Sequence, residues 1–225
     1  MVCTARKLWV FYASIIEFGA HLHSADTWLP VAVVPSKFMP TVKGGLSSFV
    51  ARLLERLFLP LEISGMRVDA PLSGPRVLLC RFGANLADYD ALKKSLDIMG
   101  ASGLVPCPKC QNVVMRGRLP HGHAYLQTIA SADRLRFDER DDAVMRATAA
   151  EIVAANVAMT RAEFAQKQKT HGIHHNPDGL LFSLGDAFGP ISTLRFDPMH
   201  IFYSQGIVGI EIHLVMRALE HQGVS

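Results

Sequence analysis

Long apolar runs are missing from this sequence. No stretch approaches the roughly 20 consecutive apolar residues that a helix needs to cross a bilayer. The earliest apolar stretch, residues 8–16, is short and contains Tyr12 and Ser14. Bulky Phe18 stands where a signal peptide requires small residues before its cleavage site. We therefore expect an intracellular chain without a membrane segment or a secretory signal.

Cysteine, charge and repeats are also scarce. Four cysteines in 225 residues are too few for a disulfide scaffold. Only 19% of the residues are charged and 49% are hydrophobic, a composition that excludes general disorder. The length of 225 residues is sufficient for one large domain or two small ones. The formal net charge of +3 is compatible with a nucleic-acid partner but is too small to indicate one.

Apolar runs bounded by turn-forming residues predict strands. We expect strands at residues 8–18, 27–34, 65–70 and 76–82, with a helix as the alternative for the first of them. The connection between the first two is short enough for an antiparallel hairpin. Residues 76–82 are almost continuously apolar, which is typical of a central strand covered on both faces.

Helical spacing of apolar side chains appears between these runs. We expect one helix capped by Ser47 or Ser48, one that begins at Asp88 and one unbroken helix over residues 141–169. Residues 201–219 are an apolar amphipathic stretch, in which we expect a terminal helix after Gly206. A loop rich in Gly and His is expected ahead of residue 141. Helices and strands alternate along the chain, which predicts an α/β layered domain.

The turn Cys107-Pro108-Lys109-Cys110 is the sharpest chemical feature of the sequence. A Cys-x-x-Cys turn places two thiolates on one side of a tight loop, as a tetrahedral zinc ion requires. A redox pair needs the cysteines at the start of a helix, whereas no helix is expected directly behind this pair. Zinc is the favoured interpretation, and a redox pair or two inert thiols are the alternatives.

The two remaining zinc ligands should be His, Cys or a carboxylate. Ten histidines are available, so spacing alone does not select a ligand. The candidates that stand near one another or within a motif are His121, His123, His171, His174, His175 and His200.

Three carboxylates are candidates for a second metal site. Asp88 follows an apolar run, at the strand end where sites gather in open α/β sheets. Glu17 ends the first apolar run, and Glu211 stands between Ile210 and Ile212. Three convergent carboxylates could hold two Mg²⁺ ions for in-line chemistry on phosphodiesters. The alternative is that Asp88 caps a helix and Glu211 is exposed.

Four motifs follow one another along the chain: Trp-Leu-Pro-Val-Ala-Val-Val-Pro at 28–35, Leu-Ala-Asp-Tyr-Asp-Ala at 86–91, Gly-Leu-Val-Pro-Cys-Pro-Lys-Cys at 103–110 and Asp-Pro-Met-His at 197–200. In this order they resemble the catalytic core of CACTA (En/Spm-type) cut-and-paste transposases of the DDE/D group, as a fragmentary or degenerate member. The resemblance covers about residues 28–211. It implies an RNase H-like mixed sheet with flanking helices and a helical, zinc-stabilised insertion.

The resemblance assigns catalytic roles to three acids. Asp88 matches the second catalytic acid of the family. Glu211 is the expected third acid, with Asp197 as its rival. The family has an Asp before the Trp-Pro-Val strand, where this chain offers Glu17 in Glu-Phe-Gly. Either Glu17 substitutes for it or the first acid lies upstream of Met1, where the DNA-binding region of an intact transposase is also expected.

The resemblance also implies a zinc cluster. Cys107 and Cys110 match the paired cysteines of the family, and His200 matches its motif histidine. Asp197, in the same motif, is a further candidate ligand. The zinc ion would be structural and would hold the insertion to the catalytic layer.

The expected organisation has three segments: 1–106 as the first part of the RNase H-like core, 107–196 as the insertion, and 197–225 as a terminal helix that returns to the core. The implied activity is Mg²⁺-dependent DNA strand transfer, in the nucleus or elsewhere inside the cell, with an inactive domain as the alternative and a homo-oligomer as an option. DNA phosphates would be contacted by arginines such as Arg116, Arg118, Arg134 and Arg136, for which a solvated face is the alternative. The alternative function is a zinc-stabilised module that binds DNA or protein without catalysis.

Overall fold

The computed structural model describes residues 8–70, 74–118, 124–128 and 134–197. It is a mixed α/β structure with several helices and small sheets, each of two strands. The chain forms two compact units, Met1–Gly83 with Asn176–Ala187, and Ala84–His175 with Phe188–Ser225. The units are interleaved along the chain. None of the helices described in these ranges is long and apolar enough to cross a membrane.

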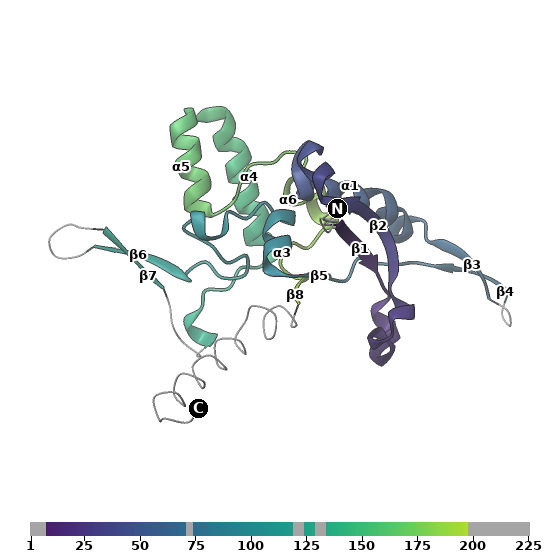
Figure 1. Cartoon of the computed structure of the whole chain (residues 1–225). Helices are drawn as coiled ribbons and strands as arrows, with labels where there is room; N and C mark the ends of the chain where they lie inside the picture. Colours follow the sequence, from purple (N-terminus) through teal and green to yellow (C-terminus); the bar gives the residue numbers. More distant parts are fainter. Residues whose placement is uncertain (1–7, 71–73, 119–123, 129–133, 198–225) are drawn as a thin grey trace, which may run out of the picture. The chain divides into compact units, whose positions relative to one another are not determined.

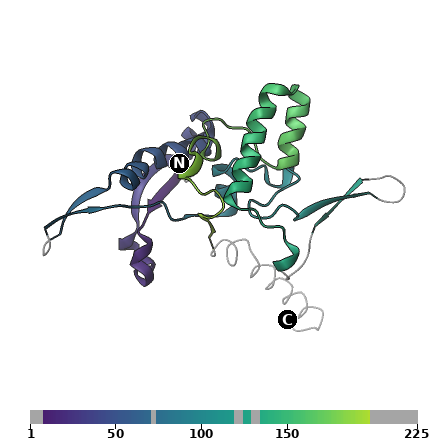
Figure 2. The same cartoon turned by 180° about the vertical axis from the view of Figure 1, so that it is seen from behind.

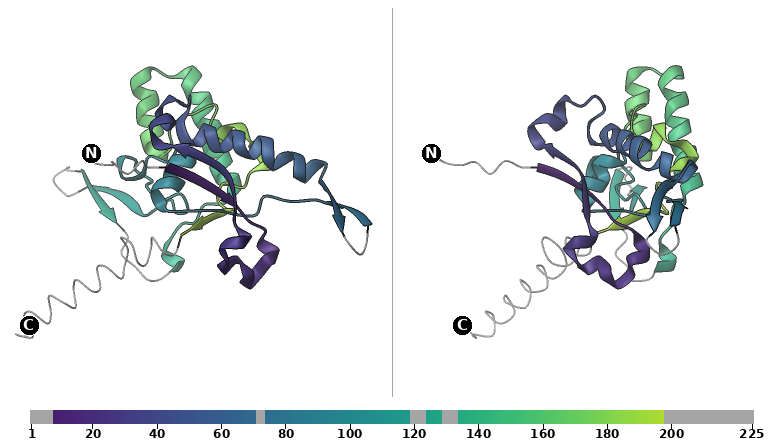
Figure 3. Two further views of the ribbon diagram at one scale, coloured as in Figure 1. Left: turned by 45° about the vertical axis from the view of Figure 1, so that its right-hand side comes forward. Right: turned by 90° about the vertical axis from the view of Figure 1, so that its right-hand side faces the viewer.

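The first unit opens with the expected hairpin. Strands β1 (Leu8–Ala13) and β2 (Leu29–Pro35) pair antiparallel, which confirms the prediction. Strand β1 ends at Ala13 and not at the expected residue 18, because the 3-10 helix η1 (Ile16–His23) begins at Ile16. Gly19 within η1 has φ 54°. A second 3-10 helix, η2 (Ala25–Thr27), leads into β2, and this part of the chain is purple in Figure 3.

Helix α1 (Gly45–Leu57) follows the 3-10 helix η3 (Ser36–Thr41). The prediction that Ser47 or Ser48 caps this helix was wrong, because Gly44 is the N-cap and both serines lie buried in the first turn. The Ser47 hydroxyl accepts a hydrogen bond from the backbone N–H of Leu180 at 2.8 Å, so it joins α1 to helix α6 (Leu180–Ser183).

A second hairpin closes the first unit. Helix α2 (Leu59–Ile63) was not predicted. It leads into β3 (Met66–Ala70), which confirms the strand expected at 65–70, and β3 pairs antiparallel with β4 (Gly74–Leu78). The prediction of a covered central strand at residues 76–82 was wrong, because every residue of β4 is exposed. The apolar composition of these residues suits a buried strand, but β4 belongs to a sheet of only two strands, and its residues stay exposed.

The second unit is built around a parallel strand pair. Strand β5 (Asn85–Ala87) lies beside β8 (Leu194–Phe196), and helix α3 (Tyr89–Ser95) contacts both strands (Figure 1). Six fully buried side chains from these elements and the neighbouring helices form the core of this unit: Leu92, Leu96, Met145, Ile152, Ile173 and Leu194. The predicted helical start at Asp88 is confirmed.

The expected single helix at 141–169 is two helices. Helices α4 (Asp142–Ala158) and α5 (Arg161–His171) lie side by side (Figure 2). The break occurs because Thr160 adopts extended backbone angles and forms a capping box with Glu163, whose carboxylate accepts from the Thr160 N–H at 3.0 Å. Helix propensity alone favoured continuation through this point, and the capping signal overrides it.

Between α3 and α4 the chain forms a third hairpin where a loop was expected. Strands β6 (Val114–Arg118) and β7 (Ala124–Thr128) pair antiparallel. The second unit also contains the short 3-10 helices η4 (Gly100–Ser102) and η5 (Arg134–Arg136). A further one, η6 (Gly185–Ala187), belongs to the first unit.

Gly172 ends α5 in a place that tolerates no side chain. Its φ is 70°, and a Cβ atom at this position would stand 2.2 Å from the carbonyl oxygen of Val105. We expect Gly172→Ala to lower the free energy of unfolding by more than the ~1–2 kcal/mol of left-handed strain alone, because backbone must move. Gly100→Ala is the control, since its φ is 62° but the nearest atom is the movable Lys93 side chain. Equal losses in urea denaturation of the two variants would contradict this account.

Candidate functional site

Two acids follow the two parallel strands of the second unit. Ala87 of β5 is in register with Phe196 of β8. Asp88 and Asp197 come next in each chain segment, and the N–H of Asp197 donates to the carbonyl of Ala87 at 2.9 Å. The carboxyl ends of parallel strands meet at one sheet edge. This register therefore brings the backbones of Asp88 and Asp197 close together, although the two residues are far apart in the sequence.

Asp88 also caps a helix. Its Oδ1 accepts a hydrogen bond from the N–H of Ala91 at 2.7 Å, and its backbone is extended (φ −65°, ψ 164°), as an N-cap requires. The expected alternative role of Asp88 is thus confirmed. The cap uses one carboxylate oxygen, and Oδ2 makes no hydrogen bond with the residues that the structure describes. Capping and metal binding are therefore compatible at this side chain.

The Cys-x-x-Cys turn brings its two sulfurs together. Both cysteines are half-buried and neither forms a disulfide, and Pro108 between them is buried. Burial, followed by the charge of Cys107 and a hydrogen bond with it, raises the pKa of Cys110 to about 11. The Tyr89 hydroxyl donates to the carbonyl of Pro106 at 2.7 Å, so α3 holds the start of the turn. Two adjacent sulfurs supply half of a tetrahedral zinc shell.

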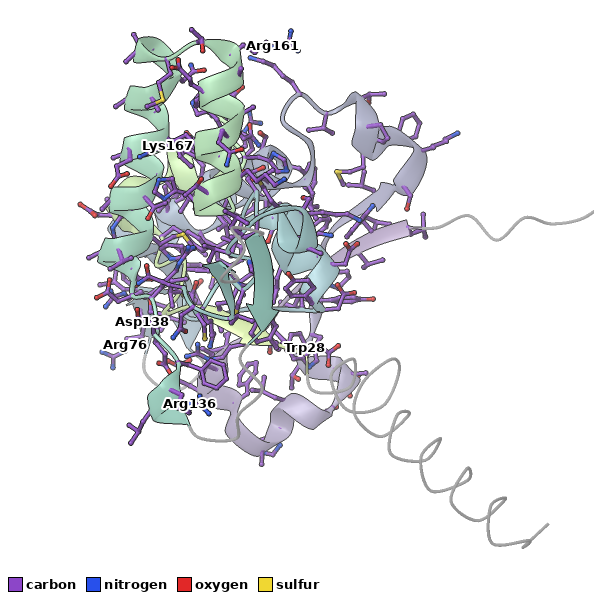
Figure 4. The ribbon with its side chains drawn as sticks, turned by 90° about the vertical axis from the view of Figure 1, so that its left-hand side faces the viewer. Trp28, Arg76, Arg136, Asp138, Arg161 and Lys167 are labelled. Carbon is purple, nitrogen blue, oxygen red and sulfur yellow. The ribbon has the colours of Figure 1, made fainter. Side chains whose placement is uncertain are left out.

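The segment ahead of α4 runs along the Cys-x-x-Cys turn and holds it in place. The backbone N–H of Arg140 donates to Lys109 at 2.8 Å, and the N–H of Gln111 donates to Asp138 at 2.9 Å. The Asn112 side chain adds hydrogen bonds with the N–H of Asp138 at 2.8 Å and the carbonyl of Arg136 at 3.0 Å. Arg136 and Asp138 are labelled on this segment in Figure 4. Backbone pairing with residues 136–140 therefore holds the turn against this segment.

A contact links the turn to the acid-bearing strand. The Lys109 ammonium lies 5.8 Å from the centre of the Phe196 ring. Phe196 is the last residue of β8 and directly precedes Asp197. The cysteine turn and the end of β8 are thus neighbours. His200, three positions after Asp197, lies outside the described residues.

The other predicted acids and ligands are distributed as follows. Glu17 lies in the first turn of η1, in the first unit, so it stays a prediction. Glu211, His121 and His123 lie outside the described residues. No group of three or more His, Cys, Asp or Glu side chains that could hold a metal ion occurs in the part of the chain that the structure describes.

Histidines near α5 have structural partners. The Nε2 atom of His171 lies 3.4 Å from the Glu151 carboxylate, and the His175 ring packs edge-on against Phe164 with centroids 5.8 Å apart. Among the predicted DNA-contacting arginines, Arg116 and Arg118 lie on β6, Arg134 begins η5, and Arg136 is exposed.

Sequence reasoning missed Arg140. Its side chain is only 6% exposed, its Nη1 donates to the Met145 sulfur at 3.7 Å, and its Nη2 donates to the carbonyl of His171 at 3.4 Å. Burial lowers the pKa of Arg140, whereas negative charge on Cys107 and Cys110 raises it. In the sequence Arg140 stands in a charged run before a helix, which is typical of a solvated surface, so no pattern indicated its burial.

The second unit therefore carries two groupings with different ligand chemistry. Carboxylates in register at a strand edge suit a hard cation such as Mg²⁺, and paired sulfurs suit zinc. The two groupings are connected through Lys109 and Phe196. No family model, no curated protein and no solved structure matches this chain.

Proposed function

We propose that this chain is a transposase-derived, RNase H-like domain that resembles the DDE/D DNA strand-transfer enzymes. The observation that carries the proposal is the parallel register of β5 and β8, which sets Asp88 and Asp197 at one strand edge. Acids from separate parts of a chain that meet at such an edge are the arrangement that metal-dependent phosphodiester chemistry needs. The resemblance to CACTA transposases also assigns Asp88 as a catalytic acid, and it offers Asp197 as the rival of Glu211 for the third acid.

The acidic residues would hold Mg²⁺ and orient the reacting phosphodiester. Asp88 would ligate through the oxygen that the helix cap leaves over, and the fixed cap would hold its carboxylate in one rotamer. The strand register supports Asp197 as the partner of Asp88, the role for which Glu211 was the first candidate in the sequence. Glu17 remains the candidate for the first acid. Bound Mg²⁺ ions would activate water or a DNA 3′-hydroxyl and stabilise the leaving oxygen.

Zinc would be structural in this proposal. The donor set fits half of a zinc site, since the Cys107 and Cys110 sulfurs are adjacent and the turn is fixed by the segment 136–140. His200 is the proposed third ligand, and the contact of Lys109 with Phe196 supports it, because the chain that leads to His200 starts beside the turn. Exposed Arg136 and the arginines of β6 would contact DNA phosphates.

Nicking of supercoiled plasmid DNA tests the proposal. The whole chain should convert supercoiled to relaxed circles with Mg²⁺ and should lose this activity on chelation and in Asp197→Asn. The second candidate function is a zinc-stabilised binding module, which the capping role of Asp88 favours, because the cap alone accounts for an acid at this position. DNA binding without nicking by a folded, zinc-loaded chain would support that candidate and contradict the first.

A further inference from the structure

Arg140 carries the one buried side-chain nitrogen or oxygen atom, among the described residues, that has no hydrogen-bond partner. The atom is Nε, in a residue that is only 6% exposed. A buried cation with an unpaired N–H is costly, so native structures retain one only where something else pairs with it. A missing partner of opposite charge or with a lone pair is therefore indicated beside Nε.

The surroundings of Arg140 identify this partner. Its two other nitrogens are used, by the Met145 sulfur and by the carbonyl of His171. Its own backbone pairs with Lys109, in the middle of the cysteine turn, and Glu139 forms a backbone bridge to Cys110. The acidic side chains that interact electrostatically with its guanidinium are Cys107 and Cys110. Neutral thiols are weak acceptors, whereas metal-bound thiolates accept hydrogen bonds from N–H groups.

We propose that Arg140 is the outer hydrogen-bond donor and counter-charge of a metal–thiolate centre at Cys107 and Cys110. This inference rests on the zinc part of the proposed function and adds a positioning residue to it. A buried guanidinium offsets the negative charge that two thiolates bring into the unit. Its Nε–H pairs with a sulfur and fixes that sulfur toward the metal.

Cobalt(II) titration of the whole chain tests this role, because cobalt replaces zinc and absorbs through sulfur-to-metal charge transfer. We expect Arg140→Met to weaken cobalt and zinc binding about 10- to 100-fold, the usual effect of losing an outer partner. We also expect its charge-transfer band to move to lower energy, because a sulfur without the N–H bond is a stronger electron donor. Arg140→Lys, which keeps the charge, should recover part of the affinity.

Arg161→Met is the matched control, since Arg161 is an exposed arginine at the start of α5 (Figure 4). It should bind cobalt as the unsubstituted chain does. Arg140→Gln serves if the methionine variant does not fold, and the same two readouts apply to it. Unchanged affinity and an unchanged band in a folded Arg140 variant would overturn the inference while leaving the zinc site intact. Absence of any thiolate–cobalt band in the unsubstituted chain would instead overturn the zinc site, and this inference with it.

Discussion

Asp88→Asn is expected to abolish Mg²⁺-dependent nicking of DNA while leaving the second unit folded. Asparagine is as good an N-cap as aspartate, so the hydrogen bond to the N–H of Ala91 survives. The charge that holds the cation is lost, and we expect activity to fall by more than the ~100-fold that losing an outer partner of a metal ligand can cost. Plasmid nicking and thermal unfolding, measured on the same preparation, check both parts.

Three further variants separate the cap from the chemistry. Asp88→Ser should also keep the cap and lose the activity, whereas Asp88→Ala should lose the activity and about 1 kcal/mol of stability. Asp90→Asn is the control, because Asp90 is an exposed acid two residues further on that pairs with Lys93 at 3.0 Å. Normal nicking by folded Asp88→Asn would mean that Asp88 is only a cap.

Removal of zinc is expected to have the second large effect. The chain should hold one zinc ion, and a strong chelator should lower the free energy of unfolding of the second unit by several kcal/mol. This is less than the roughly 10–16 kcal/mol of zinc-finger peptides, because the unit has a packed core of its own. Cys107→Ser and Cys110→Ser should have the same effect without chelator. Metal analysis and unfolding with and without chelator measure this.

Cys80→Ser provides the control for the cysteine variants. Cys80 is a half-buried free thiol in the first unit, so its loss should leave zinc content unchanged. A redox pair would behave differently, with no stoichiometric zinc and a disulfide that forms reversibly between Cys107 and Cys110. That result would contradict the structural zinc site.

Local signals in the sequence predicted part of this fold. The hairpin of β1 and β2 was predictable because two apolar runs flank a short connection, and the start of α3 because Asp88 precedes helical spacing. Strand β5 was missed because three residues are too few for any periodicity. The preceding apolar run, residues 76–82, attracted the assignment in its place.

The candidate site divides in the same way. Asp88, Asp197 and the two cysteines were accessible to sequence reasoning because they stand in short motifs. The proximity of Asp88 to Asp197 was not accessible, since it depends on the pairing of β5 with β8. Arg140 was inaccessible for a physical reason: an arginine becomes buried only when tertiary neighbours enclose it, and those neighbours come from residues 107–110, 145 and 171.

The parallel pairing of β5 with β8 also has a kinetic consequence. The chain leaves the first of these strands at Asp88 and returns to its neighbour only at Leu194, after the cysteine turn, the hairpin of β6 and β7, and the four helices α3 to α6. Contacts that close so long a loop form slowly, because the ends must first find each other. The helical hairpin and the turn are local structures that can form early. During folding the two acids should therefore become neighbours late, so a half-folded chain would lack the acidic pair on which the proposed DNA cleavage depends.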